Sequence, residues 1–354
     1  MSKVSAVLVC DARTGSLEIA GLTVLDRLVV TAHRAGCAPI FVTGGTTPPL
    51  PRAEALGIQI SRAPDAAGPQ REPALLIEGS VLVEVRDLAN VIAQGGQLVS
   101  AKGVPLPVRM TVEHPRPVVA GPAATSIVDD SSAAEAERKL WASLTSTADG
   151  FVDRLVNRPL GRPLAKLLVR TPISPNQVSI VSILIGIASA WFFARGNFIT
   201  GAVVFQLCAV IDCVDGDLAR ALFKQSRLGK WLDLGGDQVV HFSVFAGIGV
   251  GVARLDPSVP ALALGASAAL GVLLCFAWII RALRQPAAQR GPLLNKLLDA
   301  TANRDFSLVL LALAILGRMD LFLWMAGIGI HVFWIALLAL QIGRAAPAMS
   351  RETA

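Results

Sequence analysis

Four aspartates lie close together in the middle of the chain, between two long apolar stretches. Asp212 and Asp215 are three residues apart, and Asp233 and Asp237 are four residues apart. On helices of 3.6 residues per turn, each pair therefore shares one face. Only a short basic turn separates the two predicted helices, so the two acidic faces can meet. The spacing predicts one site built from four carboxylates.

Such a cluster, in or beside a membrane, needs compensating positive charge. Without it, desolvation and mutual repulsion would raise the carboxyl pKa values until the groups took up protons. Hard oxygen ligands select Mg²⁺, Mn²⁺ or Ca²⁺ over zinc, and no Cys/His set of zinc spacing lies nearby. Two such ions about 4 Å apart form a clamp that recurs in phosphoryl transfer. The small residues Gly216 and Ala219 share the face of Asp212 and would let a bulky group approach the backbone.

Two other interpretations of the aspartates are open. They can be helix-end charges that face water, or they can form the relay of a cation or proton transporter. The transporter interpretation gives no role to Gly216 or to the Ala219–Arg220 pair.

The whole segment 212–237 matches the pattern D-x2-D-G-x2-A-R-x8-G-x3-D-x3-D at all eight fixed positions. This pattern resembles the signature of the CDP-alcohol phosphotransferase (phosphatidyltransferase) family of integral membrane enzymes. The resemblance implies that the first three aspartates bind metal and orient the CDP diphosphate, and that Asp237 accepts the acceptor proton and also touches metal. It implies a CDP site formed by Asn176, Asp212, Asp215, Gly216, Ala219, Arg220 and Gly229.

The reaction implied by this resemblance is transfer of a phosphoalcohol group from a CDP-alcohol to the hydroxyl of an acceptor alcohol, with release of CMP. Two Mg²⁺ or Mn²⁺ ions per active site would assist it. A role in phospholipid biosynthesis follows from the same family, as does a homodimeric assembly.

The composition supports a membrane location. Hydrophobic residues make up 53% of the 354 residues, and they are concentrated after residue 177. Five of six apolar stretches are long enough to cross a hydrocarbon core of about 30 Å, while the fifth in order is short. We expect residues 178–343 to form a bundle of six transmembrane helices, at 178–194, 199–219, 235–253, 260–280, 306–317 and 321–343. The net charge of +6 suits anionic lipid or phosphorylated substrates better than nucleic acid, because the basic residues lie at the membrane edges.

Lys and Arg counts in the connections predict the orientation. One side would hold sixteen of them and the other side only Arg195, Arg254 and Arg318. The positive-inside rule therefore places both termini, the aspartates and a short tail (344–354) in the cytosol, with the helices in the cell inner membrane. The first twenty residues show no basic-then-apolar signal layout, so we expect the amino-terminal part to remain in the cytosol.

Residues 143–177 approach the membrane as an amphipathic segment, in which leucines alternate with basic residues. A solvated charged helix is the alternative interpretation. The stretch 171–179, TPISPNQVS, also resembles the entry segment of the same family, particularly its inositol-phosphate-using branch with a fused cytidylyltransferase domain. That resemblance makes Asn176 a nucleotide contact.

Arginines at the cytosolic helix ends are candidates to bind an acceptor phosphate, because guanidinium groups bind phosphate through two parallel hydrogen bonds. Positive-inside anchoring explains the same residues equally well. If they bind phosphate, the acceptor is a phosphorylated polyol such as inositol phosphate or glycerol phosphate. The candidates are the helix-end residues Arg281, Arg284, Arg304 and Arg344, together with Arg154 of the amphipathic segment.

Residues 1–142 read as a separate α/β domain. An apolar strand at 5–10, an amphipathic helix at 22–36 and a second strand at 38–45 give the βαβ unit of a parallel, Rossmann-like sheet. The layout resembles a nucleotidyltransferase-like domain, but its phosphate loop retains only Arg13 and Gly15 as candidates, and Glu78 stands where a metal-binding aspartate would fall. A second metal ligand would fall near Asp129 or Asp130. We expect a catalytically inert scaffold or binding module, with a loop-rich insertion at 46–72.

Overall fold

The structure is a computed structural model that describes residues 4–9, 11–44, 47–62, 73–145, 149–286, 290–301 and 306–342. The chain divides into two compact units. The first combines Met1–Thr145 with two short segments from later in the sequence, Val169–Thr171 and Ala219–Lys224. The second comprises Ser146–Leu168, Pro172–Leu218 and Gln225–Ala354.

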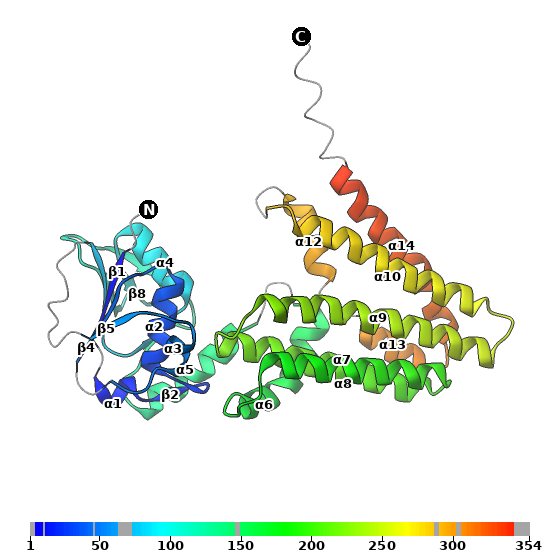
Figure 1. Cartoon of the computed structure of the whole chain (residues 1–354), viewed down its shortest axis with the longest axis horizontal. Coiled ribbons are helices and arrows are strands. Elements are labelled where there is room, and N and C mark those ends of the chain that lie inside the picture. The colour runs from blue at the N-terminus through cyan, green and yellow to red at the C-terminus, as the bar shows by residue number, and fades with distance from the viewer. Residues whose placement is uncertain are drawn as a thin grey trace, which may run out of the picture. The chain divides into compact units, whose positions relative to one another are not determined.

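The first unit is an α/β fold around a seven-stranded sheet, drawn mainly in blue and cyan in Figure 1. The strands have the spatial order β10-β8-β9-β6-β1-β4-β5. Among these described strands, only β9 runs antiparallel to its neighbours. In chain order the strands are β1 (Ser5–Val9), β4 (Ile40–Thr43), β5 (Ile60–Arg62), β6 (Ala74–Glu78), β8 (Gly96–Val99), β9 (Pro105–Met110) and β10 (Arg116–Val119).

The predicted strand–helix–strand order at the start of the chain is confirmed. β1 is apolar, pairs with β4 and β6 in parallel, and is buried on both faces. α2 (Val24–Arg34) connects β1 to β4; its N-cap Thr23 accepts a hydrogen bond from the backbone N–H of Asp26. The other helices of this unit are α1 (Ala12–Gly15), α3 (Pro51–Ala55), α4 (Val85–Gln94) and α5 (Asp130–Ser143).

The expected loop-rich insertion at 46–72 is wrong for residues 51–62. These residues form α3 and the edge strand β5, which pairs in parallel with β4. The Asp26 carboxylate accepts from the backbone N–H groups of Arg52 and Ala53, at 2.8 Å each, and so holds the first turn of α3. This contact joins residues 26 positions apart, so local composition did not reveal it. Residues 63–72 lie outside the described part of the chain.

Two small two-stranded antiparallel sheets complete the first unit. β2 (Glu18–Ile19) pairs with β3 (Leu22–Thr23), and β7 (Val81–Leu82) pairs with β11 (Thr125–Ser126). Ala20 and Gly21 form the two-residue turn between β2 and β3, and both have positive φ, at 46° and 72°. This is the geometry of a type I′ hairpin turn, which favours glycine.

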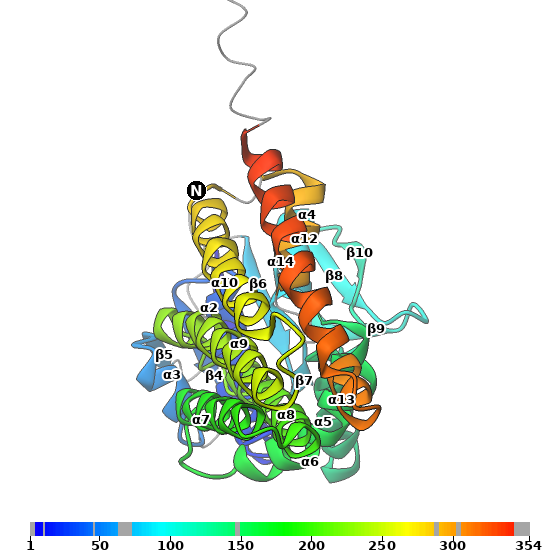
Figure 2. The same ribbon diagram turned by 90° about the vertical axis from the view of Figure 1, so that its right-hand side faces the viewer.

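The second unit consists of helices, coloured from green to red in Figures 1 and 2. α9 packs against both α7 and α10, and α10 packs against α14. In chain order the helices are η1 (Asp153–Asn157), α6 (Arg158–Leu168), α7 (Pro175–Ala194), α8 (Phe198–Ala221), α9 (Arg227–Leu255), α10 (Ala261–Leu283), α12 (Pro292–Thr301), α13 (Phe306–Ile315) and α14 (Met319–Ile342).

Five of the described helices are long and apolar enough to cross a membrane: α7, α8, α9, α10 and α14. The expected bundle of six transmembrane helices is not confirmed, because the fifth expected stretch, 306–317, contains the short helix α13 (Phe306–Ile315). α13 has 10 residues, which at 1.5 Å per residue gives about 15 Å against a hydrocarbon core of about 30 Å. α9 begins at Arg227, before the expected 235, because Ser226 caps a polar first turn. Asp233 and Asp237 therefore lie inside this helix and not at its start.

Glycines allow α7 and α9 to approach closely. A Cβ on Gly247 would lie 2.4 Å from the carbonyl oxygen of Ala190, and one on Gly251 would lie 2.0 Å from that of Phe193. Both distances are too short for a side-chain carbon, so these positions require glycine. Since α7 and α9 both carry predicted site residues, this contact helps to fix the site.

Candidate metal and nucleotide site

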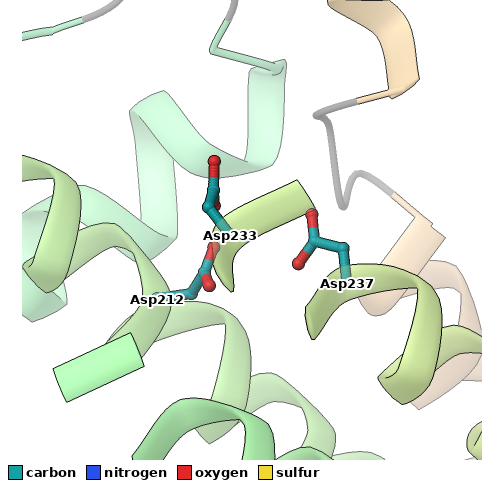
Figure 3. Close-up of side chains that lie close together, drawn as sticks. All are labelled: Asp212, Asp233 and Asp237. Carbon is teal, nitrogen blue, oxygen red and sulfur yellow. The ribbon is translucent and has the colours of Figure 1, made fainter. Parts of the chain in front are cut away.

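Three of the four predicted metal-binding aspartates come together where α8 faces α9. Asp212 comes from α8, and Asp233 and Asp237 come from successive turns of α9 (Figure 3). One carboxylate oxygen of each lies within 4.8 Å of those of the other two. The i, i+4 spacing puts Asp233 and Asp237 on one face, and the pairing of the two helices adds Asp212. A single cation can therefore contact all three side chains.

The fourth aspartate, Asp215, has a different environment. It is buried, and its carboxylate accepts a short hydrogen bond from the Ser179 hydroxyl of α7. One turn along α7, the Ser182 hydroxyl lies 3.4 Å from Oδ1 of Asp212. Asp215 thus lies one turn along α8 from Asp212, next to the three-aspartate group.

Ser179 and Ser182 are site residues that the sequence interpretation missed. They lie three residues apart in a mostly apolar helix, and both are buried. Their i, i+3 spacing could have indicated a polar site, because two hydroxyls on one face of a membrane helix need polar partners.

The donor set fits Mg²⁺ or Mn²⁺. The three grouped side chains offer carboxylate oxygens only, without sulfur or imidazole. Hard divalent cations take such ligands, whereas structural zinc sites use Cys and His. Repulsion among three carboxylates this close would be relieved by a bound cation.

Two residues of the predicted nucleotide site, Asn176 and Gly229, are in contact range of each other. A Cβ added to Gly229 would lie 3.0 Å from Oδ1 of Asn176. Asn176 lies in the first turn of α7, after Pro175 and the N-cap Ser174, whose side chain forms a capping box with Gln177. Gly229 lies in the first turn of α9, where Ser226 accepts from its backbone N–H. The start of α7 therefore lies beside the start of the helix that carries Asp233 and Asp237.

The remaining predicted CDP contacts lie on α8. Gly216 is one turn after Asp212 and is half-buried. Ala219 and Arg220 are in the last turn of α8, which packs with the first unit.

A buried arginine holds the amphipathic segment to α8. The Arg158 guanidinium donates to both carboxylate oxygens of Asp149, at 2.5 and 2.6 Å, and also to Asp217. Asp217 follows Gly216 directly in the motif and is 2% exposed. The sequence interpretation assigned no role to Asp217, since the motif leaves its position open. This ion-paired group connects the segment before α7 to the helix that carries Asp212 and Asp215.

A second polar contact supports the same packing. Asn157 is fully buried; its amide donates to Asp153 at 2.7 Å, and its carbonyl oxygen accepts from Gln206 of α8. The turn Asp153–Asn157 is π-helical, a form that is often found at functional sites.

The candidate phosphate-binding arginines are dispersed. Arg154 is exposed and lines a small pocket with Asp149, Gly150, Phe151 and Leu155. Arg281 and Arg284 are at the end of α10, where the Arg281 guanidinium lies 5.7 Å from the centre of the Trp278 ring. Arg304 and Arg344 lie outside the described residues. An arginine wall beside the aspartates therefore stays a prediction.

In the first unit, the candidate nucleotide and metal residues are engaged in fold contacts. Gly15 of the predicted phosphate loop is buried, and its backbone N–H donates to the carbonyl oxygen of Asp11, at 2.9 Å. Glu78 forms an ion pair with Arg109 across the sheet, at 3.2 Å. Asp129 caps α5, and hydrogen bonds from the backbone N–H and hydroxyl of Ser132 lower its pKa to about 2.

One comparison with known proteins identifies a family for the helical part of the chain. Residues 172–340 match the model of the family described as CDP-alcohol phosphatidyltransferase. The bifunctional IPC transferase and DIPP synthase of Rubrobacter xylanophilus is 36% identical over 207 residues, which are 58% of this chain and 45% of that protein. The phosphatidylinositol phosphate synthase of Streptomyces avermitilis is 38% identical over 84 residues, 23% of this chain and 34% of that protein.

A crystal structure of a phosphatidylinositol phosphate synthase from Mycobacterium tuberculosis with CDP-DAG bound is also similar. The matched region covers 51% of this chain and 93% of the chain in that crystal structure, with 20% sequence identity and a TM-score of 0.39.

The chain spans less than half the length of each of the two curated relatives. One relative is named as a bifunctional transferase and synthase, and the other as a synthase. Neither name supports the cation-transporter alternative. The matched region contains Asn176 and the complete aspartate motif. The helical half of this chain, from residue 172 to residue 340, is a CDP-alcohol phosphatidyltransferase domain.

Proposed function

We propose that the chain is an integral membrane CDP-alcohol phosphotransferase. It transfers a phosphatidyl or phosphoinositol group from a CDP-alcohol to the hydroxyl of an acceptor alcohol and releases CMP. The observation that carries this proposal is the grouping of Asp212, Asp233 and Asp237 within 4.8 Å, inside a family domain whose signature is complete.

Each motif residue has a role in this reaction. Asp212, Asp215, Asp233 and Asp237 would hold two Mg²⁺ or Mn²⁺ ions, which would neutralise charge on the diphosphate. Ser179 and Ser182 orient Asp215 and Asp212 through their hydroxyls. Asn176 and Gly229 lie at the border of the cytidine site. Gly216, Ala219 and Arg220 line this site from α8.

The transfer exchanges one phosphorus–oxygen bond for another. The acceptor oxygen forms a bond to the β-phosphorus of the CDP-alcohol, and the bond from that phosphorus to the bridging oxygen of CMP breaks. The electron pair of the broken bond leaves with CMP. Asp237 takes the acceptor proton, because its carboxylate lies beside the other metal ligands and can act as a base there.

The acceptor is a phosphorylated polyol, inositol phosphate or glycerol phosphate. Basic residues support this choice: Arg154 lies before the first membrane helix, and Arg281 and Arg284 lie at the end of α10. The names of the relatives, which include phosphatidylinositol phosphate synthases, point to the same acceptor class.

The proposed setting is the cell inner membrane, with both termini in the cytosol and the protein as a homodimer. The excess of Lys and Arg on one side of the six predicted crossings supports this orientation. It requires α13 to take part in the fifth crossing, because both termini lie on one side only when the number of crossings is even. The first unit acts as a scaffold without nucleotidyltransferase activity, because Gly15, Glu78 and Asp129 form contacts within the fold.

The test is a donor-by-acceptor screen with the purified full chain. CDP-diacylglycerol or CDP-inositol is incubated with Mg²⁺ and inositol phosphate or glycerol phosphate, and CMP and the product are identified by mass spectrometry. Asp237→Asn should abolish CMP release in a folded protein. Asp256→Asn, a change at an exposed aspartate after α9, is the control and should retain it.

Two results would contradict the proposal. Absence of CMP with every donor and acceptor pair removes the enzyme assignment, and cation flux in liposomes would then favour the transporter. Separately, CTP-dependent release of pyrophosphate from inositol phosphate would show that the first unit is an active enzyme.

A further inference from the structure

The first unit contains a basic cavity that the transfer reaction does not use. Its volume is about 490 Å³, within the range of about 300–1,000 Å³ that is typical of small-molecule sites. The cavity lies between the β2–β3 hairpin, α3 and the two short segments that pack with this unit, Val169–Thr171 and Ala219–Lys224.

Positive charge predominates in the lining. Arg52, Arg170 and Lys224 face a single acidic residue, Glu18. The rest of the wall includes the apolar side chains of Leu22, Pro51, Ala55, Val169 and Leu222. The cavity therefore suits an anionic group attached to a less polar body.

Arg52 is placed to bind such an anion. One terminal nitrogen of its guanidinium donates to the carbonyl oxygen of Phe223 at 2.7 Å, while its Nε is buried without a hydrogen-bond partner. Arg34 donates to the same carbonyl oxygen, also at 2.7 Å. Two guanidinium groups thus converge on one neutral acceptor, and burial together with the charge of Arg52 lowers the pKa of Arg34. A bound anion would relieve this repulsion.

The turn that these arginines hold is strained. Phe223 has a φ of 54°, a left-handed conformation that is uncommon for a bulky residue. Its ring lies under the guanidinium groups of Arg27 and Arg34, at 5.3 and 4.9 Å from the ring centre. The first unit therefore fixes the turn between α8 and α9, and Lys224 of this turn lines the cavity.

The cavity also lies close in sequence to membrane helices. Arg170 and Thr171 shortly precede α7, and Leu222 and Lys224 shortly follow α8. Both helices are long enough to cross a membrane, so a phospholipid headgroup and a soluble phosphorylated compound are both candidate ligands.

We infer that this cavity is a second ligand site, which binds a phosphate group carried on an organic body through Arg52, Arg170 and Lys224. Phosphate suits it because guanidinium and ammonium groups donate charge-assisted hydrogen bonds to its oxygens. The ligand would bridge α3 to the α8–α9 turn and so stabilise the segment that joins the two halves of the aspartate motif. The inference does not depend on the proposed transfer reaction.

The test uses the full chain in detergent with EDTA, so that the aspartate site holds no metal. Calorimetric titrations compare inorganic phosphate, glycerol 3-phosphate and dihexanoyl phosphatidylglycerol at constant ionic strength. The double variant R170Q/K224Q should weaken binding about tenfold or more, the loss expected for a charged hydrogen bond. Its matched control is R86Q/K102Q, which removes the same charge from other positions of the same unit.

A second variant tests the cavity without changing its charge. Ala55→Trp places an indole at an exposed lining position and should block binding by volume. The site is supported if binding is saturable, is lost in the lining variants and is kept in the control. The probe that binds more tightly then shows whether the natural ligand is a soluble phosphorylated compound or a lipid headgroup. No saturable binding of any probe, or equal binding by R170Q/K224Q and R86Q/K102Q, would overturn it.

Discussion

Arg158 of α6 and Asp217 of α8 form a buried ion pair beside the aspartate motif. The two side chains are 6% and 2% exposed, and Asp217 directly follows Gly216. Asp149 occupies the other edge of the guanidinium, so one arginine serves two carboxylates. Loss of one partner from a buried ion pair destabilises the folded protein strongly. Removal of one of these three residues should therefore cost more stability than removal of a residue from an exposed ion pair.

The order of stability losses follows from this pair. Arg158→Met removes the guanidinium that two buried carboxylates share and should cost about 3–5 kcal/mol. Asp217→Asn leaves Arg158 with Asp149 and should cost less. Thermal unfolding of the purified protein in detergent measures both, and an equal or larger loss for Asp217→Asn would contradict the arrangement.

Ser179→Ala should weaken metal binding. The variant removes the hydroxyl that donates to Asp215, and loss of such an outer contact typically lowers metal affinity or activity about 10–100-fold. The dependence of CMP release on Mn²⁺ concentration measures the effect. Ser189→Ala is the control, because Ser189 is equally buried on α7 but donates to the carbonyl of Gly186. Equal metal dependence in the two variants would exclude a positioning role for Ser179.

Divalent metal should stabilise the folded protein. At a concentration about one hundred times the dissociation constant, a ligand that binds only the folded state adds about 2.7 kcal/mol. Addition of Mg²⁺ after EDTA treatment should therefore raise the midpoint of thermal unfolding. Asp233→Asn should lose most of this increase, whereas Asp256→Asn should retain it. An unchanged increase in Asp233→Asn would remove this residue from the metal site.

Substitution by alanine should affect folding stability differently at two glycines of α9. Gly251→Ala places a Cβ 2.0 Å from the carbonyl oxygen of Phe193, and overpacking of this kind costs about 1–3 kcal/mol or more. At Gly235 an added Cβ meets nothing within 4 Å, so Gly235→Ala should be neutral or stabilising by up to about 1 kcal/mol. Unfolding midpoints compare the two variants, and equal midpoints would contradict the close contact of α7 and α9.

Cys37 of the first unit should resist alkylation. It is 1% exposed, and burial raises the pKa of its thiol from 9.0 to about 12. Because the pKa of Cys37 is higher in the folded than in the unfolded state, the protonated thiol contributes to folding stability. This contribution is complete below pH 9 and is lost as the pH rises towards 12. Iodoacetamide at about pH 8 should label Cys37 in denaturant but not in the native protein, as read by peptide mass spectrometry. Rapid native labelling would show that this part of the unit opens.

The sequence alone determined the features that depend on local spacing. The i, i+3 and i, i+4 separations placed Asp212 with Asp215 and Asp233 with Asp237 on helix faces, and the apolar stretches marked the membrane helices. The alternation of apolar strands with an amphipathic helix likewise predicted β1, α2 and β4. In each case the periodicity of the backbone fixes which neighbouring side chains point the same way.

Tertiary structure decided the contacts between residues far apart in the chain. Ser179 reaches Asp215 across 36 positions, Arg158 reaches Asp217 across 59, and Arg34 reaches Phe223 across 189. Each pair depends on how separate helices and strands pack, which no local pattern encodes. For the same reason the sequence missed the basic cavity, whose lining comes from segments about 200 residues apart between Glu18 and Lys224.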